Sequence, residues 1–382
     1  MGISGLLPIV LPKLVRKHIS SYRSYRVGID GHGWMYQVLP CVAEKLFFKI
    51  PTKQHISLFE SKIRHLEKQG ITPVVVLDGD SLLSKEATNM RRKLKKDRCR
   101  KEAEAWLMQN NPIKAKACMR QCIYVTNEIL LDITRMLERI NVEYIISPYE
   151  SDAELCYLQK IGYIDYIMTE DSDLIAYGSE NVLYKFDGAF VYEFNRICLE
   201  QAKDRHFKEN ILDIAILSGC DYLSSVHGVG VVTAHKLLSR EKTIERVVEH
   251  LKSKKPVPST YLDDFARAKK TFMHQVVYDP ILGKRKHLHD TNENLLFLGS
   301  FEEDEYTAER IKNIHGSGGN IQNPILSLLQ NAITTKIKRH FVPIVKKRAM
   351  SAIESSEFKR RETRTVVDTN THSPYFSSNT AH

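Results

Sequence analysis

The chain has 382 residues, 42% of them hydrophobic, and a formal net charge of +10 at pH 7. The hydrophobic fraction can supply a sizeable core, which excludes wholesale disorder. The positive charge favours a polyanionic partner, either nucleic acid or an anionic membrane surface. No apolar run approaches the roughly 20 residues that span a bilayer, and the N-terminal residues match neither a secretory signal nor a myristoylation pattern. We therefore expect nucleic acid as the partner, and no membrane.

Short apolar stretches alternate with helical patterns in the first half of the chain. The predicted strands are Tyr25–Asp30, Pro73–Asp78, Val142–Ile146 and Tyr163–Thr169, and the predicted helices cover 34–48, 54–69, 121–140 and 150–161. The β-branched run after Pro73 is typical of a strand that is buried on both faces. This alternation predicts an α/β domain with a mainly parallel central sheet flanked by helices.

A basic segment, 84–120, separates the second predicted strand from the third. From Lys85 to Lys101 it holds nine basic residues and two acidic ones, with no glycine and no proline before Pro112. Good helix formers make up most of this segment. We expect a helical insertion that projects from the domain and does not pack flat on the sheet.

Downstream, the pattern from Asn210 to Leu238 predicts two helices joined by a tight hairpin at 227–230, and 242–276 is also expected to be helical. After about residue 290 the pattern decays. The stretch 336–364 holds ten basic residues and three acidic ones, and Ser, Thr and Asn dominate from Val367 on. Because such a composition buries little, we expect disorder in these last residues.

Seven acidic residues stand at strand ends or soon after apolar runs. They are Asp30 and Asp78, which end strands, Glu150 and Asp152, which open a helix, Asp171 and Asp173, which follow the fourth strand, and Asp221, which follows an apolar run. In an open parallel sheet, ligands bind outside the carboxyl ends of the strands. We expect these carboxylates to converge on one rim.

Phosphodiester hydrolysis would explain such a cluster. The reaction needs an attacking hydroxide and stabilisation of developing charge, and two hard cations with oxygen ligands supply both. Without a cation, crowded carboxylates repel one another and raise each other's pKa. Taken singly, Asp30 and Asp78 could each belong to an ordinary turn, and Glu150 and Asp152 could merely favour the positive end of a helix dipole.

Five sequence blocks resemble the signatures of the flap-endonuclease superfamily of 5′ nucleases. They are MGISGLL (1–7), VLDG (76–79), SPYESDAE (147–154), TEDSDL (169–174) and LSGCDYL (217–223). The sequence LSGCDYLSS (217–225) and the stretch VVYDPI (276–281) favour the exonuclease 1 branch of the superfamily. The resemblance runs from Met1 to about residue 290.

The resemblance implies roles for the residues that match the family's motifs. The seven carboxylates match its metal ligands, which hold two Mg²⁺ ions, with Mn²⁺ as a substitute. Lys85 and Arg92 match the basic pair at the base of the family's helical arch, which steers the scissile phosphate. Both follow Asp78 closely and could contact the same phosphate as the metals. Gly2 matches a small residue that lies beside the active site in this family. The alternative is that Gly2 belongs to an exposed N-terminus without a functional role.

The hairpin with Gly228 and Gly230 resembles the family's helix–two-turn–helix element, a DNA-binding region. Glycines let backbone N–H groups approach a phosphate closely, which gives a sequence-independent grip. Family members often place K⁺ there, which would involve Ser218, Ser225 and Val229. In isolation, the hairpin could equally be a plain turn.

Tyr36 stands where exonuclease 1 proteins generally carry His and where flap endonucleases often have Tyr. Either ring would stack on a base near the cut. The alternative is that Tyr36 is an aromatic residue of a helix that faces the core. The residue therefore bears on the balance between exonuclease and flap activity.

The resemblance implies an N-terminal nuclease region (1–99), the basic arch (84–120), an internal nuclease region (121–215), the helix–two-turn–helix region (216–290) and a basic, partly disordered tail (291–382). In the tail, Ser373, Tyr375 and Phe376 resemble a short motif that docks on MutL homologues, although Pro374 stands where a basic residue is usual. A solvated terminus without a partner is the alternative. Two basic clusters, 346–348 and 359–361, could form a nuclear import signal or add affinity for DNA.

We therefore expect a nuclear, monomeric, metal-dependent 5′→3′ exonuclease of double-stranded DNA, with 5′-flap endonuclease activity. It would act in mismatch repair, end resection and recombination, on 5′ ends, nicks, gaps or flaps. A flap endonuclease of replication, a DNA-binding repair scaffold without catalysis and a structure-specific RNA nuclease remain as alternatives. The intact set of acidic residues argues against the scaffold.

Overall fold

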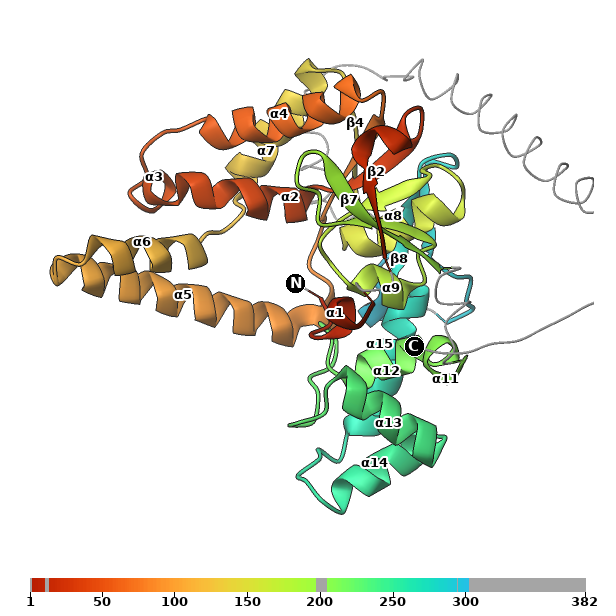
Figure 1. The fold of residues 1–382 in the computed structure, drawn as a ribbon. Coiled ribbons are helices and arrows are strands. Elements are labelled where there is room, and N and C mark those ends of the chain that lie inside the picture. Colours follow the sequence, from red (N-terminus) through yellow and green to blue (C-terminus); the bar gives the residue numbers. More distant parts are fainter. Residues whose placement is uncertain (1, 11–13, 197–204, 294, 302–382) are drawn as a thin grey trace, which may run out of the picture. The chain divides into compact units, whose positions relative to one another are not determined.

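The computed structural model describes residues 2–10, 14–196, 205–293 and 295–301 (Figure 1). The centre is a seven-stranded sheet in the order β1-β7-β6-β5-β2-β3-β4. The four predicted strands are confirmed with slightly shifted ends. They are β2 (Arg26–Asp30), β3 (Thr72–Leu77), β4 (Glu143–Ile146) and β5 (Tyr166–Met168). These strands pair in parallel, so their carboxyl ends share one edge of the sheet.

The remaining strands were not predicted from the sequence. Strand β6 (Asn181–Tyr184) pairs in parallel with β5, and β7 (Phe190–Asn195) and β1 (Val15–His18) extend the sheet with antiparallel pairing. A separate hairpin joins β8 (Val276–Asp279) to β9 (Lys284–His287). The sheet is therefore mainly parallel, as predicted, with an antiparallel edge.

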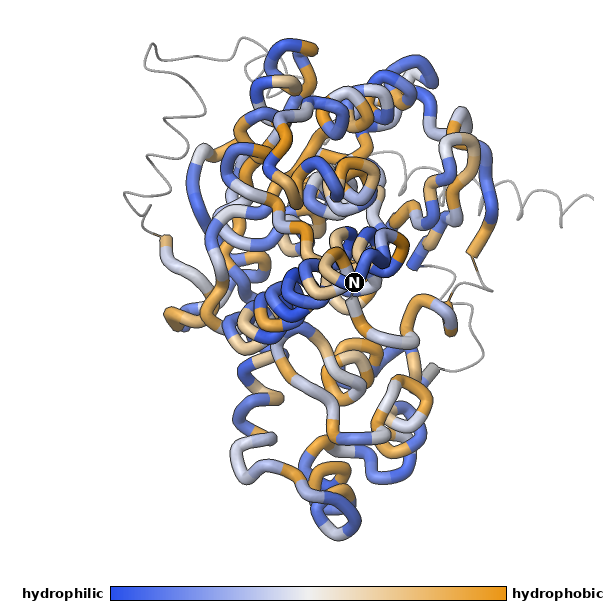
Figure 2. Tube along the Cα trace, turned by 90° about the vertical axis from the view of Figure 1, so that its left-hand side faces the viewer, coloured by the Kyte–Doolittle hydropathy of each residue, from blue (hydrophilic) through white to orange (hydrophobic). Residues whose placement is uncertain are grey.

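Helices cover both faces of the sheet. Ile29 and Leu77 belong to a large apolar core shared with α2 (Gly31–Val38), α4 (Gln54–Lys68) and α7 (Asn127–Arg139). Side chains alternate along a strand, and a Cβ atom on Gly28 would meet Leu155 of α8 (Ser151–Lys160). Helix α8 therefore packs on the opposite face. In Figure 2 the outer helices carry both hydrophobic and hydrophilic residues, as amphipathic helices do.

The predicted helical insertion is present. Helix α5 (Glu86–Met108) and α6 (Pro112–Gln121) pack against each other and extend away from the sheet (Figure 1). Pro112 occupies the first turn of α6, where its missing N–H costs nothing. Helix α6 also contacts α3 (Ala43–Phe47), where Lys116 and Glu44 form an ion pair of 3.0 Å. We call the pair α5–α6 the arch.

The helices predicted within 210–238 and 242–276 are present, and α9 (Asp173–Tyr177), which lies between β5 and β6, and α11 (Arg205–Glu209) were not predicted. The helices found in the predicted stretches are α12 (Ile211–Leu217), α13 (Val231–Glu241), α14 (Ile244–Lys252) and α15 (Tyr261–His274). The predicted helical stretch 242–276 is thus two helices with a break between them. Short elements complete the described part. They are α1 (Leu6–Val10), η2 (Ile19–Tyr22), η3 (Leu39–Val42), η4 (Leu83–Lys85) and η5 (Leu296–Leu298).

Among the described residues, no helix is long and apolar enough to cross a membrane. Most of the predicted tail lies outside the described residues, including both basic clusters and the motif of Ser373, Tyr375 and Phe376. The expected disorder from Val367 on concerns the same part of the chain.

Candidate active site

Three carboxylates form the centre of the site. Asp171 follows β5, Asp173 opens α9, and Asp152 lies in the first turn of α8. One ligand oxygen from each lies within 4.8 Å of the others. The predicted convergence of chain-distant carboxylates therefore occurs at the carboxyl edge of the sheet, because β5 and the loops beside it end there.

Two further carboxylates are fixed to the same edge by hydrogen bonds. Asp30 caps α2, since its Oδ1 accepts the N–H of Gly33 at 2.8 Å, while its Oδ2 accepts the Thr169 hydroxyl at 3.0 Å. Asp78, directly after β3, accepts the N–H of Ser151 at 2.9 Å. These hydrogen bonds join the end of β2 to the residue after β5, and the end of β3 to the start of α8.

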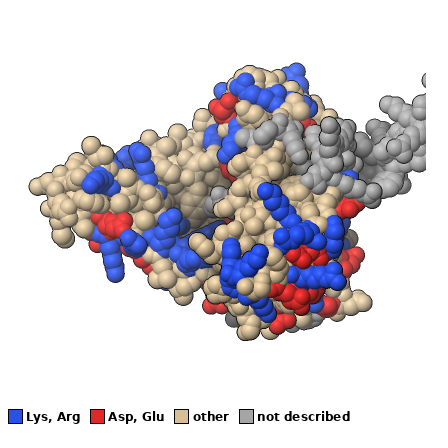
Figure 3. All heavy atoms as spheres, turned by 60° about the horizontal axis from the view of Figure 1, so that its bottom comes forward, with Lys and Arg blue, Asp and Glu red and all other residues tan. Residues whose placement is uncertain are grey.

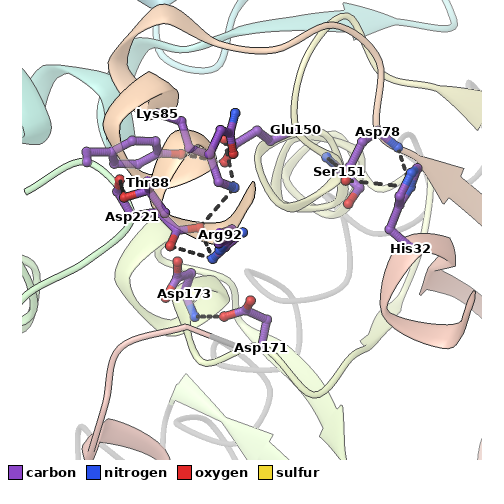
Figure 4. A network of polar contacts seen from close by, with 12 residues as sticks. His32, Asp78, Lys85, Thr88, Arg92, Glu150, Ser151, Asp171, Asp173 and Asp221 are labelled. Carbon is purple, nitrogen blue, oxygen red and sulfur yellow. Dashed lines mark hydrogen bonds and ion pairs between the residues drawn. The ribbon is translucent and has the colours of Figure 1, made fainter. Parts of the chain in front are cut away.

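The base of the arch contributes two cations. The Lys85 ammonium lies 2.9 Å from both Glu150 Oε1 and Asp221 Oδ2, and Arg92 donates to the two oxygens of Asp221 at 2.7 and 2.9 Å. Figure 4 shows this group next to Asp171 and Asp173. In the same network, Thr88 donates to the backbone carbonyl of Asp221 at 2.7 Å. The arch is thus anchored to the carboxylates by charge and by hydrogen bonds.

The electrostatics of the cluster favour a bound cation. Burial, with a contribution from Asp78, raises the pKa of Asp30 to about 6. Burial and the charge of Asp171 raise the pKa of both Asp152 and Asp173 well above the ordinary range. For Asp221, the charges of Lys85 and Arg92 outweigh burial, and its pKa is lowered.

The oxygen ligands fit a divalent metal. Asp152 Oδ1 is buried without a hydrogen-bond partner among the described residues, which is costly unless a cation compensates for it. The donor set is made of carboxylates, the ligands that hard divalent cations prefer. The geometry therefore suits a metal held by Asp152, Asp171 and Asp173, with the other carboxylates close by.

The N-terminal segment packs directly on this cluster. The Ile3 N–H donates to Asp173 Oδ1 at 2.9 Å, and the Ser172 hydroxyl donates to the Ile3 carbonyl at 3.3 Å. A Cβ atom on Gly2 would lie 2.1 Å from Asp171 Oδ1. The structure thus places Gly2 against the acidic cluster and not in an exposed start.

A cavity of about 440 Å³ opens over the carboxylates. Its lining includes Asp30, Asp78, Glu150, Asp152, Asp171, Asp221, Lys85, Arg92 and Tyr36. Tyr36 thus borders the cavity and does not point into the core. Figure 3 shows Lys and Arg side chains around the hollow between the arch and the rest of the domain. Nine of the predicted residues therefore share one basic-rimmed cavity.

The predicted hairpin forms a separate feature that does not line this cavity. Gly228 has a φ of +73°, Gly230 caps α13, and both are exposed. Of the three predicted potassium ligands, Val229 is buried and Ser225 is exposed, while the Ser218 hydroxyl donates to a backbone carbonyl at 2.8 Å. The exposed N-terminus of α13 is a suitable contact for a phosphate.

Several residues that position the site were not predicted. Thr169 and Ser151 hold Asp30 and Asp78, and Tyr222 donates to Glu150 Oε2 at 2.7 Å. Each stands one or two residues from a predicted carboxylate, so their hydroxyl or amide groups gave a weak signal. His32, whose Nδ1 accepts the Asp78 N–H at 3.0 Å, stands two residues after Asp30 and gave the same weak signal.

Two sequence profiles match the chain. The profile of the XPG N-terminal domain matches residues 1–99, and that of the XPG I-region matches residues 141–221. Together they contain all seven carboxylates, Lys85 and Arg92.

Comparison with curated proteins finds exonuclease 1 proteins. Exonuclease 1 of Arabidopsis thaliana is 34% identical over 77% of this chain and 41% of its own length. Exodeoxyribonuclease 1 of Schizosaccharomyces pombe is 30% identical over 80% of this chain and 55% of its own length. The chain thus spans about half or less of the length of these two relatives.

Among solved structures, the catalytic core of Rad2 in complex with DNA substrate superimposes with a TM-score of 0.56. The alignment covers 82% of this chain and 95% of that one, at 18% sequence identity. At this identity the likeness shows a shared fold.

Proposed function

We propose that the chain is a member of the flap-endonuclease superfamily, in which it resembles exonuclease 1 proteins. Its activity would be that of a divalent-metal-dependent 5′→3′ exonuclease of double-stranded DNA that also cuts 5′ flaps. One observation carries this proposal. Seven carboxylates and the cations Lys85 and Arg92 meet at one edge of the sheet, and the cavity above is rimmed by basic side chains.

The carboxylates would hold two Mg²⁺ ions, which Mn²⁺ can replace. Asp152, Asp171 and Asp173 offer the most compact set of ligands, and Asp30 and Asp78 are kept on the same edge by Thr169 and Ser151. When bound, the ions supply an activated water and stabilise the developing charge on the phosphate.

The protein's own groups position the scissile phosphate. Lys85 and Arg92 neutralise Asp221 and Glu150, and in the proposed complex they also face the phosphate oxygens. Charged donors fixed in advance stabilise a developing negative charge without having to reorganise. Tyr36 offers its ring to a nucleobase beside the cut.

The hairpin would grip the duplex away from the cut. Exposed backbone N–H groups at Gly228 and Gly230 would contact a phosphate, and Ser218, Ser225 and Val229 would hold K⁺ there. The described part supports this with the exposed hairpin and the N-terminus of α13.

We also propose the wider setting from the resemblance alone. The protein would act as a monomer in the nucleus, in mismatch repair, end resection and recombination. Its tail would dock on a MutL homologue through Ser373, Tyr375 and Phe376.

Cleavage assays test the activity. The protein is incubated with Mg²⁺ and a 5′-recessed duplex, a 5′ flap, a nick, a gap and a blunt end, with RNA as a control. We expect release of 5′ nucleotides from the DNA ends and little action on RNA. Asp171→Ala and Asp173→Ala should abolish cleavage. Wild-type rates in either variant would refute the proposal, and a strong preference for the flap would favour a flap endonuclease.

A further inference from the structure

One face of α5 carries cations from the metal cluster outwards. Thr88, Arg92 and Lys96 recur every four residues, which places them on one side of the helix, and Lys85 is the N-cap residue just before it. Lys85 and Arg92 bond to the carboxylates. Lys96 stands four residues beyond Arg92, about 6 Å farther along the helix axis. The next position on this face therefore lies one helical turn away from the expected phosphate.

At that position Lys96 joins two tyrosines. Its ammonium donates to the Tyr36 hydroxyl at 3.1 Å and lies 4.8 Å from the centroid of that ring. The same nitrogen lies 4.5 Å from the ring centroid of Tyr124, which stands in the connection between α6 and α7. Tyr36, Tyr124, Lys96 and Lys93 all line the cavity that holds the carboxylates.

Tyr124 is held at its hydroxyl and leaves part of its ring free. The hydroxyl donates to Asp97 at 2.9 Å and lies 3.3 Å from the Lys93 carbonyl, while 38% of the residue is exposed. Partial burial and the hydrogen bond to Asp97 raise the pKa of Tyr124 to about 12, so the hydroxyl stays a donor at neutral pH. An exposed tyrosine ring fixed at one end beside two lysines is suited to stacking on a base while the cations face the backbone.

We propose that Tyr124, with Lys93 and Lys96, forms a second subsite for an unpaired nucleotide of the cleaved strand, beyond the one that stacks on Tyr36. This inference rests on the proposed nuclease function and names the part of the substrate that the cavity takes. The subsite is specific for single-stranded DNA next to the cut, because a stacked base must be free of its complement.

The subsite makes Tyr124 a specificity-determining residue. A 5′ flap has further unpaired nucleotides that reach the second ring. A 5′-recessed duplex has paired bases, so that fewer free bases are available there. Loss of the Tyr124 ring should therefore weaken the binding of flaps more than that of recessed ends.

The experiment compares three variants with wild type on both substrates. Tyr124→Ala removes the ring, and Tyr124→Phe keeps the ring but loses the hydroxyl bonds. Tyr25→Ala is the control, since Tyr25 is 41% exposed, packs on another tyrosine at 5.2 Å and does not line the cavity. Steady-state kinetics give KM and kcat, and 2-aminopurine at the second unpaired position of the flap reports stacking in metal-free buffer.

We expect Tyr124→Ala to raise KM for the flap about tenfold, the usual effect of one stacked base, and to alter KM for the recessed duplex less than about twofold. The fluorescence change of 2-aminopurine on binding should be lost in Tyr124→Ala. Tyr124→Phe and Tyr25→Ala should behave like wild type in both measurements.

Two results would overturn the subsite. Equal effects of Tyr124→Ala on both substrates would mean that the ring has no preference for unpaired bases. If Tyr124→Phe impaired flap binding as much as Tyr124→Ala, the effect would come from the hydrogen bonds of the hydroxyl to α5 and not from the ring. If wild type cleaved neither DNA, the proposed function would fail, but the fluorescence measurement would still decide whether the subsite exists.

Discussion

Gly2 lies so close to Asp171 that a Cβ atom on it would stand 2.1 Å from the carboxylate oxygen. The backbone there has a φ of +87°, which residues other than glycine rarely adopt. The neighbouring Ile3 N–H holds Asp173 at 2.9 Å. The N-terminal segment therefore sets the position of two carboxylates at once.

Gly2→Ala should impair the site because no room exists for the methyl group. The backbone nitrogen of Ser172 would lie only 2.8 Å from the new Cβ atom, so the segment must shift and take Asp171 with it. We expect kcat to fall at least about tenfold and the concentration of Mg²⁺ for half-maximal rate to rise. Cleavage kinetics at several Mg²⁺ concentrations measure both.

Gly5→Ala is the matched control for this prediction. Gly5 has nearly the same φ, +85°, but nothing lies within 4 Å of its Cβ position. Both variants carry the same backbone strain, and only one meets the carboxylate. Equal losses in the two would mean that strain, and not the contact with Asp171, explains the effect.

Metal binding should stabilise the fold, because the carboxylates repel one another without it. An ion at a hundredfold excess over its Kd adds about 2.7 kcal/mol, which corresponds to a rise in Tm of about 5 °C for a domain of this size. Calorimetry with EDTA or Mg²⁺ measures the rise. Asp152→Asn should show little rise, and should exceed wild type in Tm when metal is absent.

Asp263→Asn serves as the control for charge removal, since Asp263 is an exposed residue of α15. It should keep the full response to Mg²⁺. A Tm that does not respond to Mg²⁺ in wild type would contradict a metal site made from these carboxylates.

The parallel strands were predictable because burial on both faces leaves continuous apolar runs, as in Val74–Leu77. Strand β1 gave no such signal, since all four of its residues are exposed and two are basic. Strands β6 and β7 flank an Asp187-Gly188 pair. Such a pair is typical of a hairpin turn, but the two strands beside it were not predicted. The break in 242–276 is marked by Pro256 and Pro258, which are typical of a loop between helices.

The carboxylates were predictable for a similar reason, because each follows an element whose end is visible in the sequence. Contacts between distant segments were not. Nothing local in the sequence indicates that Ile3 would hold Asp173, or that Lys96 would lie between Tyr36 and Tyr124. Those contacts depend on how the arch and the N-terminal segment pack on the rest of the protein. The hydrophobic periodicity of a single element carries no information about that packing.

Lys85→Met should lower the rate without weakening metal binding. The substitution keeps the aliphatic stem and removes the charge that faces Glu150 and Asp221. Loss of one preorganised donor typically costs about 10²- to 10³-fold in kcat. The concentration of Mg²⁺ for half-maximal rate should stay or fall, because the carboxylates lose a competing cation.

Lys95→Met is the control for this prediction, since Lys95 is exposed on α5 and is not among the residues that line the cavity. Its rate should stay within about twofold of wild type. If Lys85→Met raised the requirement for Mg²⁺ as an Asp171 variant should, Lys85 would be a structural support of the metal site and not a phosphate contact.

The last described segment should matter for catalysis, although it lies beyond the two matched sequence profiles. Gly299 has a φ of +107° and packs on Tyr149, where a Cβ atom would lie 2.2 Å from the ring. The Tyr149 hydroxyl accepts the Ser300 N–H at 2.7 Å, and Tyr149 directly precedes Glu150. Gly299→Ala should therefore displace Tyr149 and lower kcat several-fold, as measured in single-turnover cleavage. Gly283→Ala, with a φ of +65° and nothing within 4 Å, should leave kcat unchanged, and equal kcat values in the two variants would exclude a role for this contact.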